Sequence, residues 1–250
     1  MNDGAPILSV DALTMRFGGF VALDGVDLQI QTGERFGLIG LIGLIGLIGP
    51  NGSGKTTLIN CVSGALANYG GSIRFAGHDL AGLKPHQRTR LGIARSFQIP
   101  RPFRSMSVRE NLAITIESAT GAAGDEIDDA ASSILQSMGL TDRADAISSG
   151  LTQIEMRKLE LARALAARPK LLISDEAMAG LSSAEVDEIL EILFHLNENG
   201  VTIIMIEHIM RAVMRFSQRI VVLDAGRKIA DGPPDAVVAN PDVERAYLGD

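Results

Sequence analysis

Hydrophobic and polar residues alternate with a period of two in the first third of the chain. The pattern is clear in residues 7–17 and 20–34, where glycine and aspartate interrupt it, and it returns in residues 71–80. Alternation of this kind is typical of strands that bury one face, and the interruptions are typical of turns. These segments therefore predict short antiparallel strands joined by tight turns.

The middle of the chain has helical spacing instead. Ser107 and Glu110 form a capping-box pattern, and apolar residues recur after it every three or four positions. Such a box provides partners for the amide groups at a helix N-terminus. We therefore expect residues 101–150 to form a mostly helical insert, interrupted by the turn-rich residues 120–126.

Helical and strand patterns alternate in the last third of the chain. This alternation indicates βαβ units around a largely parallel, buried sheet. With a helix at 55–65, we expect helices at 152–166, 184–197 and 242–248, strands at 170–174, 201–206 and 219–223, and a hairpin at 224–230.

One segment departs from these patterns. Residues 36–49 read FGLIGLIGLIGLIG, which contains four identical Leu-Ile-Gly triplets. A membrane-spanning helix needs about 20 mostly apolar residues, and glycine weakens a helix. The run is therefore too short and too rich in glycine to predict a transmembrane helix.

The composition is that of an ordinary globular protein. Of the 250 residues, 46% are hydrophobic and 21% are charged, which argues against a low-complexity chain and a polytopic membrane protein. The formal net charge of -7 makes nucleic acid a poor candidate partner. The single cysteine, Cys61, cannot form an internal disulfide, and residues 1–6 lack the regions of a signal peptide. We therefore expect a reducing, cytoplasmic location.

The strongest chemical motif follows the repeat. Residues 49–57 read GPNGSGKTT, which matches G-x-x-x-x-G-K-[ST] between an apolar strand candidate and a helix candidate. Its glycines let amide groups surround a phosphate, Lys55 adds a positive charge, and Thr56 offers a hydroxyl group to Mg2+. Chance alone gives such a match in about one chain in a hundred of this length. The motif predicts ATP binding by Gly49, Pro50, Asn51, Gly52, Ser53, Gly54, Lys55, Thr56 and Thr57.

Two adjacent carboxylates, Asp175 and Glu176, follow the predicted strand at 170–174. In a P-loop protein the first can hold the metal ion through water, and the second can polarise an attacking water. Most such pairs are solvated turns, but ligands gather at the carboxyl ends of strands in open α/β sheets. We therefore assign Asp175 to the metal ion and Glu176 to catalysis.

Together these residues resemble the ATP-binding cassette (ABC) ATPase family over residues 8–249. Further matches lie in family order: Gln98 with the Q-loop glutamine, His208 with the switch histidine, and Phe17 with the aromatic residue that stacks on adenine. Residues 179–182 lie where the D-loop is expected. Each match alone has a structural explanation, such as a core aromatic residue, but their joint order makes chance implausible.

The resemblance implies the fold of an α/β P-loop NTPase (ABC ATPase) core with an antiparallel β-subdomain and an inserted helical subdomain at 101–150. Residues 1–250 would then form a single ABC ATPase domain. Two such subunits sandwich two MgATP molecules, and each site combines the P-loop of one subunit with the signature segment of the other.

The resemblance also implies the roles of individual residues. Glu176 is the general base, and Lys55 and His208 stabilise the γ-phosphate. Thr56 and Gln98 would reach the Mg2+ ion, and Asp175 would hold its hydration shell.

The resemblance narrows to the ATPase subunits of branched-chain amino acid importers and their close relatives. It is carried by FGGFVALDGVDL at 17–28, SFQIPRPFRSMSVRENL at 96–112 and GPPDAVVANPDVERAYLG at 232–249. It implies a peripheral subunit on the cytoplasmic face of the membrane that hydrolyses ATP to power an importer for branched-chain amino acids or related small polar solutes. Substrate contacts lie on other subunits, so the cargo stays open. Its partners would be a second ATPase, two permease subunits and, indirectly, a periplasmic or extracellular solute-binding protein. The alternative is a soluble ABC ATPase with a regulatory or scaffolding role and no permease.

The chain departs from the family pattern in the signature segment, where Thr152, Gln153, Ile154 and Glu155 replace the last four residues of LSGGQ. The loss of both glycines adds bulk, and Glu155 brings negative charge toward an anion. Thr152 and Glu155 also form a capping box. Two explanations therefore stay open: a weakened but usable signature, or a purely structural helix cap. The departure favours a heterodimer of ATPases over a homodimer.

Family members have one strand-ending Ile-Gly pair before the P-loop, so we interpret residues 38–46 as a tandem-repeat expansion. A strand over all of residues 36–49 would far exceed the usual length of about five or six residues. We expect Leu47 and Ile48 to end the strand and the earlier triplets to loop out.

Overall fold

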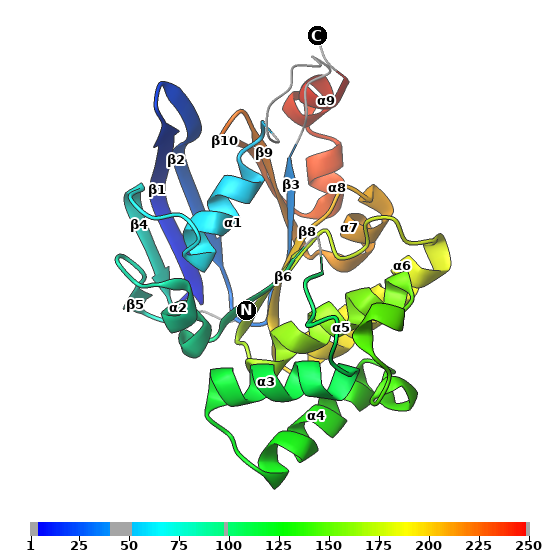
Figure 1. The fold of residues 1–250 in the computed structure, drawn as a ribbon. Helices are drawn as coiled ribbons and strands as arrows, with labels where there is room; N and C mark the ends of the chain where they lie inside the picture. Colours follow the sequence, from blue (N-terminus) through cyan, green and yellow to red (C-terminus); the bar gives the residue numbers. More distant parts are fainter. Residues whose placement is uncertain (1–4, 41–51, 98–99, 249–250) are drawn as a thin grey trace. The chain divides into compact units, whose positions relative to one another are not determined.

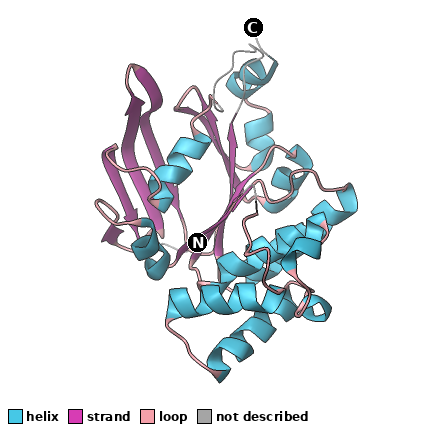
Figure 2. Ribbon diagram, viewed as in Figure 1, coloured by secondary structure: helices cyan, strands magenta, loops and turns pink. Residues whose placement is uncertain are grey.

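The fold is that of a computed structural model, which describes residues 5–40, 52–97 and 100–248. The chain divides into two compact units, one formed by residues 1–88 and 204–250 and the other by residues 89–203. Each unit combines strands with helices (Figures 1 and 2).

An antiparallel sheet with the strand order β2-β1-β4-β5 lies in the N-terminal part of the first unit. Leu8, Val10 and Leu13 of β1 are buried, while polar residues between them are more exposed. This confirms the antiparallel strands predicted from the alternating pattern. The strands are β1 (Leu8–Phe17), β2 (Phe20–Ile30), β4 (Gly70–Phe75) and β5 (His78–Asp79).

The other strands of the first unit have the order β10-β9-β3-β8. β3 (Arg35–Gly40) pairs in parallel with β9 (Arg219–Asp224), and β10 (Arg227–Gly232) returns antiparallel to β9 as the predicted hairpin. β8 (Thr202–Ile206) contains the residue at which the second unit ends and the first resumes. The parallel pairing explains why β3 and β9 read as continuous apolar runs, because such strands are buried on both faces.

β3 contains the first triplet of the repeat. Leu38, Ile39 and Gly40 are its last residues and pair with β9, and both apolar side chains are buried. We expected this triplet to loop out, but all four triplets have the same sequence, so the first can fill the strand as well as the fourth. The strand end expected at Leu47 and Ile48 lies outside the described residues. The expansion itself stays a prediction.

A buried arginine holds the C-terminal turn of α1 (Lys55–Ser63). Arg88 is 2% exposed and donates hydrogen bonds to the carbonyl oxygens of Val62 (2.9 Å) and Leu80 (2.8 Å). The Val62 carbonyl lies in the last turn of α1, where helix carbonyls lack intrahelical partners. Burial on the same helix raises the pKa of the Cys61 thiol to about 11, so the thiol is protonated at neutral pH.

Three helices pack on one another in the second unit (Figure 1). They are α3 (Val108–Thr120), α4 (Asp125–Ser137) and α5 (Gln153–Ala166), with short 3-10 turns at Thr141–Arg143 and Ser148–Gly150. The capping box predicted for α3 is present: the Glu110 amide donates to Ser107 Oγ at 3.1 Å, and the Ser107 amide donates to Glu110 Oε2 at 2.7 Å.

The second unit also contains the parallel pair β6 (Ile93–Ser96) and β7 (Leu171–Asp175), and the long helix α6 (Ser183–Glu198). The strand at β7 and the helix at α6 agree with the sequence prediction to within one residue at each end. The sequence did not predict β6, because four residues are too few to establish a period. It also missed the short helices α2 (Pro85–Leu91), α7 (Met210–Phe216) and α8 (Pro234–Val238), whereas α9 (Pro241–Leu248) was expected.

Within the described residues, each helix is too short or too polar to cross a lipid bilayer.

Candidate functional site

The N-terminus of α1 has no capping side chain. Gly54 precedes the helix with a φ of 96°, and the first turn contains no acidic residue. A Cβ atom on Gly54 would lie 2.8 Å from the Ala22 carbonyl oxygen, so both the backbone conformation and the space require glycine. The helix start therefore attracts an anion without a carboxylate of its own in the first turn.

Lys55 connects the loop to the end of β3. Its Nζ atom donates to Ser53 Oγ at 3.2 Å and to the Gly40 carbonyl oxygen at 3.4 Å. A Cβ atom on Gly40 would lie 2.2 Å from this nitrogen, so the close approach depends on glycine. Thr56 is exposed, so its hydroxyl group can reach a ligand. The predicted site residues Gly49, Pro50 and Asn51 lie outside the described residues.

The described part of the loop is supported by two neighbouring segments of the first unit. The Gly226 amide donates to the Ser53 carbonyl oxygen at 3.2 Å, and the Asp24 amide donates to the Gly226 carbonyl oxygen at 2.9 Å. Arg227 closes this arrangement with an ion pair to Asp24 at 2.7 Å. The β9–β10 turn and Asp24 of β2 thus hold the described part of the loop in place.

Two further predicted residues lie in the first unit. Phe17 ends β1 and is 47% exposed, which leaves its ring available for stacking. His208 follows β8, and its side chain is 65% exposed. Its Nδ1 atom lies 3.9 Å from Oε2 of Glu207, whose side chain is fully buried. Glu207 was missed by sequence reasoning, although a carboxylate between an apolar strand and a histidine was the available signal.

In the second unit, Asp175 ends β7 and is held by an arginine. The parallel register places Arg95 opposite Ile173, so Arg95 and Asp175 project from the same face of the two strands. The Arg95 Nη2 and Nε atoms donate to Asp175 Oδ2 at 2.6 and 3.2 Å. Sequence reasoning missed Arg95 because it missed β6. Gln98 lies outside the described residues.

Glu176 has an unusual backbone. Its φ is 48°, in the left-handed region that non-glycine residues rarely adopt. Such a conformation costs about 1–3 kcal/mol and is enriched at functional sites. The residue is half-buried, with Ala177 and Met178 fully packed behind it.

The signature segment forms the capping box suggested by its sequence. The Thr152 amide donates to Glu155 Oε2 at 2.8 Å, and the Glu155 amide donates to Thr152 Oγ1 at 3.4 Å. Arg143 Nε donates to the other carboxylate oxygen at 2.7 Å. The backbone hydrogen bond from Thr152, together with Arg143, holds the pKa of Glu155 below its usual value. The N-terminus of α5 thus has its own ionised carboxylate.

The same helix is tied to residues 179–182. Gln153 Nε2 and Arg157 Nη2 donate to the Ala179 carbonyl oxygen at 3.3 and 3.1 Å. Gly180 has a φ of 79°, so the left-handed backbone beside this contact favours glycine. Gln153 therefore has a structural use in the position where the family pattern has glycine.

No group of three or more His, Cys, Asp or Glu side chains that could hold a metal ion is found among the described residues. Mg2+ delivered with a nucleotide is usually held by one or two carboxylates together with phosphate oxygens and water. The hydroxyl group of Thr56 and the carboxylate of Asp175 are hard oxygen donors of the required kind.

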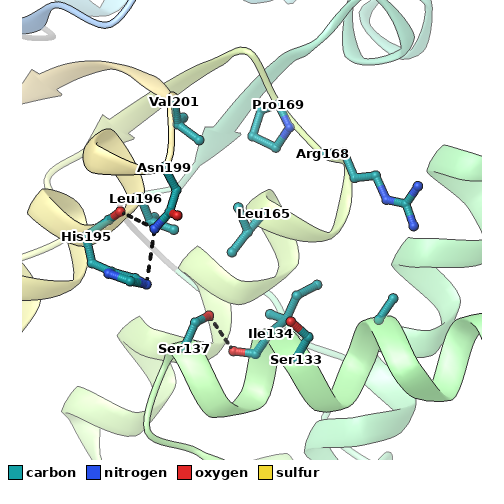
Figure 3. Close-up of a pocket in the computed structure, with 11 residues that line it drawn as sticks. Ser133, Ile134, Ser137, Leu165, Arg168, Pro169, His195, Leu196, Asn199 and Val201 are labelled. Atoms are coloured by element: carbon teal, nitrogen blue, oxygen red, sulfur yellow. Dashed lines mark hydrogen bonds between the residues drawn. The ribbon is translucent and has the colours of Figure 1, made fainter.

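A groove of about 520 Å³ lies in the second unit at the ends of α5 and α6 and beside α4 (Figure 3). Ile134, Leu165 and Leu196 are among its apolar lining residues. Of its polar groups, His195 and Asn199 form a hydrogen-bonding pair at 3.2 Å. None of the residues predicted for the nucleotide site lines this groove.

The chain matches two protein-family models. The model described as ABC transporter covers residues 23–179, and the model described as branched-chain amino acid ATP-binding cassette transporter covers residues 227–250. The high-affinity branched-chain amino acid transport ATP-binding protein BraF of Pseudomonas aeruginosa is 37% identical over 98% of each chain. The protein of the same description from Escherichia coli (strain K12), LivG, is 39% identical over 98% of each chain.

Solved structures are also similar to this chain over nearly its whole length. The ADP conformation of an ATP-binding cassette of an ABC transporter has a TM-score of 0.86 and 30% identity, covering 99% of this chain and all of that one. A nucleotide-free ATP-binding cassette has a TM-score of 0.84 and 29% identity, covering 98% of this chain and 100% of that one. Both agree with the fold class predicted from the sequence.

Proposed function

We propose that this chain, which belongs to the ATP-binding cassette (ABC) transporter family, powers an importer for branched-chain amino acids. It is an ABC ATPase, as its family and its structural neighbours indicate. The observation that carries the choice of cargo is the match of residues 227–250 to the branched-chain model, beyond the part that the general ABC model covers.

In this proposal, the first unit binds the nucleotide. The amide groups at the start of α1 and the ammonium group of Lys55 hold the phosphates, and the exposed ring of Phe17 stacks on adenine. His208 contacts the γ-phosphate, and the buried carboxylate of Glu207 orients its ring.

Thr56, Gln98 and Asp175 would hold Mg2+, which supplies neutralisation of the phosphate charge when bound. Glu176 accepts a proton from the attacking water. The left-handed backbone at Glu176 supports this role, because strain of that kind persists where the surroundings fix a functional geometry.

The role of Glu176 can be tested by Glu176→Gln in the assembled transporter. The variant keeps the shape of the side chain and is expected to bind MgATP, while the rate of hydrolysis falls by about 10² or more. Glu126→Gln, an exposed change on α4, serves as the control and is expected to leave the rate unchanged. A near-normal rate in Glu176→Gln would show that another group is the base.

We further propose that the second ATPase subunit is a different protein. The start of α5 contributes the Glu155 carboxylate and the side chains of Gln153 and Ile154 where a partner's γ-phosphate would approach. The partner then supplies an ordinary signature to this chain's own nucleotide. Reconstitution in proteoliposomes tests this: two copies of this chain with the permease are expected to give little transport, and full transport would contradict the heterodimer.

The assignment to a transporter also predicts peripheral attachment to the cytoplasmic face of the membrane through two permease subunits. Affinity purification of the chain from solubilised membranes is expected to recover both permeases, and disruption of its gene is expected to reduce uptake of labelled leucine. Recovery without permeases, and unchanged uptake, would favour the alternative of a regulatory ABC ATPase.

A further inference from the structure

The ion pair between Arg95 and Asp175 lies in the second unit, and the proposed function does not use it. Both nitrogen contacts converge on Asp175 Oδ2, and the two side chains are only 12% and 14% exposed. Charges screened from water in this way interact more strongly than a surface pair. Asp175 is therefore neutralised by a residue of its own chain.

The guanidinium group has a second contact beside this one. Arg95 Cζ lies 5.3 Å from the centre of the Phe97 ring, and Phe97 is 52% exposed. A ring at this distance attracts a cation without competing for the carboxylate. Arg95 can therefore release Asp175 and keep a favourable contact for its charge.

Both Arg95 nitrogen atoms contact Oδ2 of Asp175, so a metal ion that uses this carboxylate, directly or through a bound water, meets the guanidinium charge beside it. We propose that Arg95 is a resident counter-cation of Asp175, which neutralises this carboxylate when no metal is bound and yields it when Mg2+ arrives with the nucleotide. Arg95 is then a positioning residue that limits how strongly metal and nucleotide binding are coupled. This inference rests on the assignment of Asp175 to the metal ion, proposed above.

Removal of the Arg95 charge is expected to have opposite effects on the binding of metal-free ADP and of ADP with Mg2+. Without Arg95, the uncompensated Asp175 carboxylate repels metal-free ADP and attracts Mg2+ more strongly. The ratio of the ADP dissociation constant in chelator to that in Mg2+ is therefore expected to rise. ADP is the suitable probe because the measurement then does not depend on hydrolysis.

The experiment measures this ratio with a fluorescent ADP on the full chain. Arg95→Gln is expected to raise the ratio about tenfold, a usual size for coupling between two ligands. Arg95→Lys keeps the charge but loses the two-nitrogen contact, so we expect a rise of about two- to threefold. Arg109→Gln removes an arginine from an exposed pair with Asp145 in the same unit and is the control that leaves the ratio unchanged.

Asp175→Asn separates the possible outcomes. In that background, Arg95→Gln is expected to change the ratio less than about twofold, because the charge that Arg95 compensates is gone. If Asp175→Asn lowers the ratio but Arg95→Gln does not raise it, the counter-cation role is wrong and the metal assignment stands. If Asp175→Asn leaves the ratio unchanged, Asp175 is not at the metal site and both fail.

Thermal unfolding of each variant shows whether it is folded. If Arg95→Gln does not fold, Arg95→Lys decides the question, and an unchanged ratio in that variant overturns the proposal.

Discussion

Helices α1 and α5 begin in opposite ways. α1 follows Gly54 and has no capping side chain or acidic residue in its first turn. α5 follows Thr152 and has a complete capping box, with Glu155 also paired to Arg143. Both helix N-termini have the same tendency to attract negative charge. The start of α1 is therefore open to a ligand, whereas the start of α5 is satisfied by the chain's own carboxylate.

The other boxes support this interpretation. α3 and α6 also begin with Ser-x-x-Glu boxes, so a supplied carboxylate is the ordinary state of a long helix in this protein. The starts of α1 and of the shorter helix α7 lack both a capping side chain and an acidic first turn, and the start of α1 coincides with the phosphate-binding motif. The resemblance between α5 and the ordinary boxes supports the proposal that its signature contributes little to a partner's nucleotide.

We expect the start of α1 to be most sensitive to substitution at Gly54. In Gly54→Ala, the new methyl group meets the Ala22 carbonyl oxygen and the backbone keeps a φ that alanine disfavours. We expect the free energy of unfolding to fall by about 1–3 kcal/mol and the start of α1 to lose its affinity for ATP. Gly52→Ala, which has no neighbouring atom within 4 Å, is the stability control. Equal stability of the two variants, measured by urea unfolding, would contradict the account of Gly54.

Helix α1 also differs from α5 in the segment that precedes it, which contains the Leu-Ile-Gly repeat. Removal of three triplets gives the same protein whether residues 38–46 or 41–49 are deleted, since the copies are identical. If the repeat is an expansion, the extra triplets are expected to expose Leu and Ile side chains, and the deletion is then expected to add about 2 kcal/mol and to raise Tm by about 4–8 °C. MgATP binding is expected to persist. A lower Tm, or loss of nucleotide binding, would show that the repeat is an integral part of the structure.

The smallest expected effect concerns the cap of α5. Glu155→Gln can keep the capping-box hydrogen bond but removes the charge, so it is expected to cost about 0.3–1 kcal/mol at pH 7, the usual size for a carboxylate at a helix N-terminus. The folded protein lowers the pKa of Glu155 below its usual value of 4.5, so its stabilisation is present above pH 4.5 and is lost as pH falls through the folded pKa. The difference between wild type and variant therefore shrinks in acid.

Urea unfolding at pH 7 and in acid tests this prediction. Glu185→Gln removes the equivalent cap of α6, where the cap serine alone lowers the carboxylate pKa, and is expected to cost less at pH 7. A Glu155→Gln penalty that is independent of pH would show that the carboxylate charge does not stabilise α5.

The features that could be predicted from the amino-acid sequence are those that depend on residues close together in the chain. GPNGSGKTT and the boxes at Ser107 and Thr152 are local patterns, in which hydrogen bonds join residues three positions apart. Such contacts form whenever the segment is helical, so residue types at fixed spacing are sufficient to predict them. The antiparallel strands of the first unit were predictable for the same reason, because alternation of burial is a local property.

Contacts between segments that are far apart in the chain could be found only from the tertiary structure. The pairing of Arg95 with Asp175 depends on the register of two strands whose contacting residues are 80 positions apart. The choice of the first triplet for β3 had no local signal at all, because four identical triplets offer the same side chains. In the structure the first triplet continues the strand from Arg35 and pairs with β9, with Leu38 and Ile39 in the core.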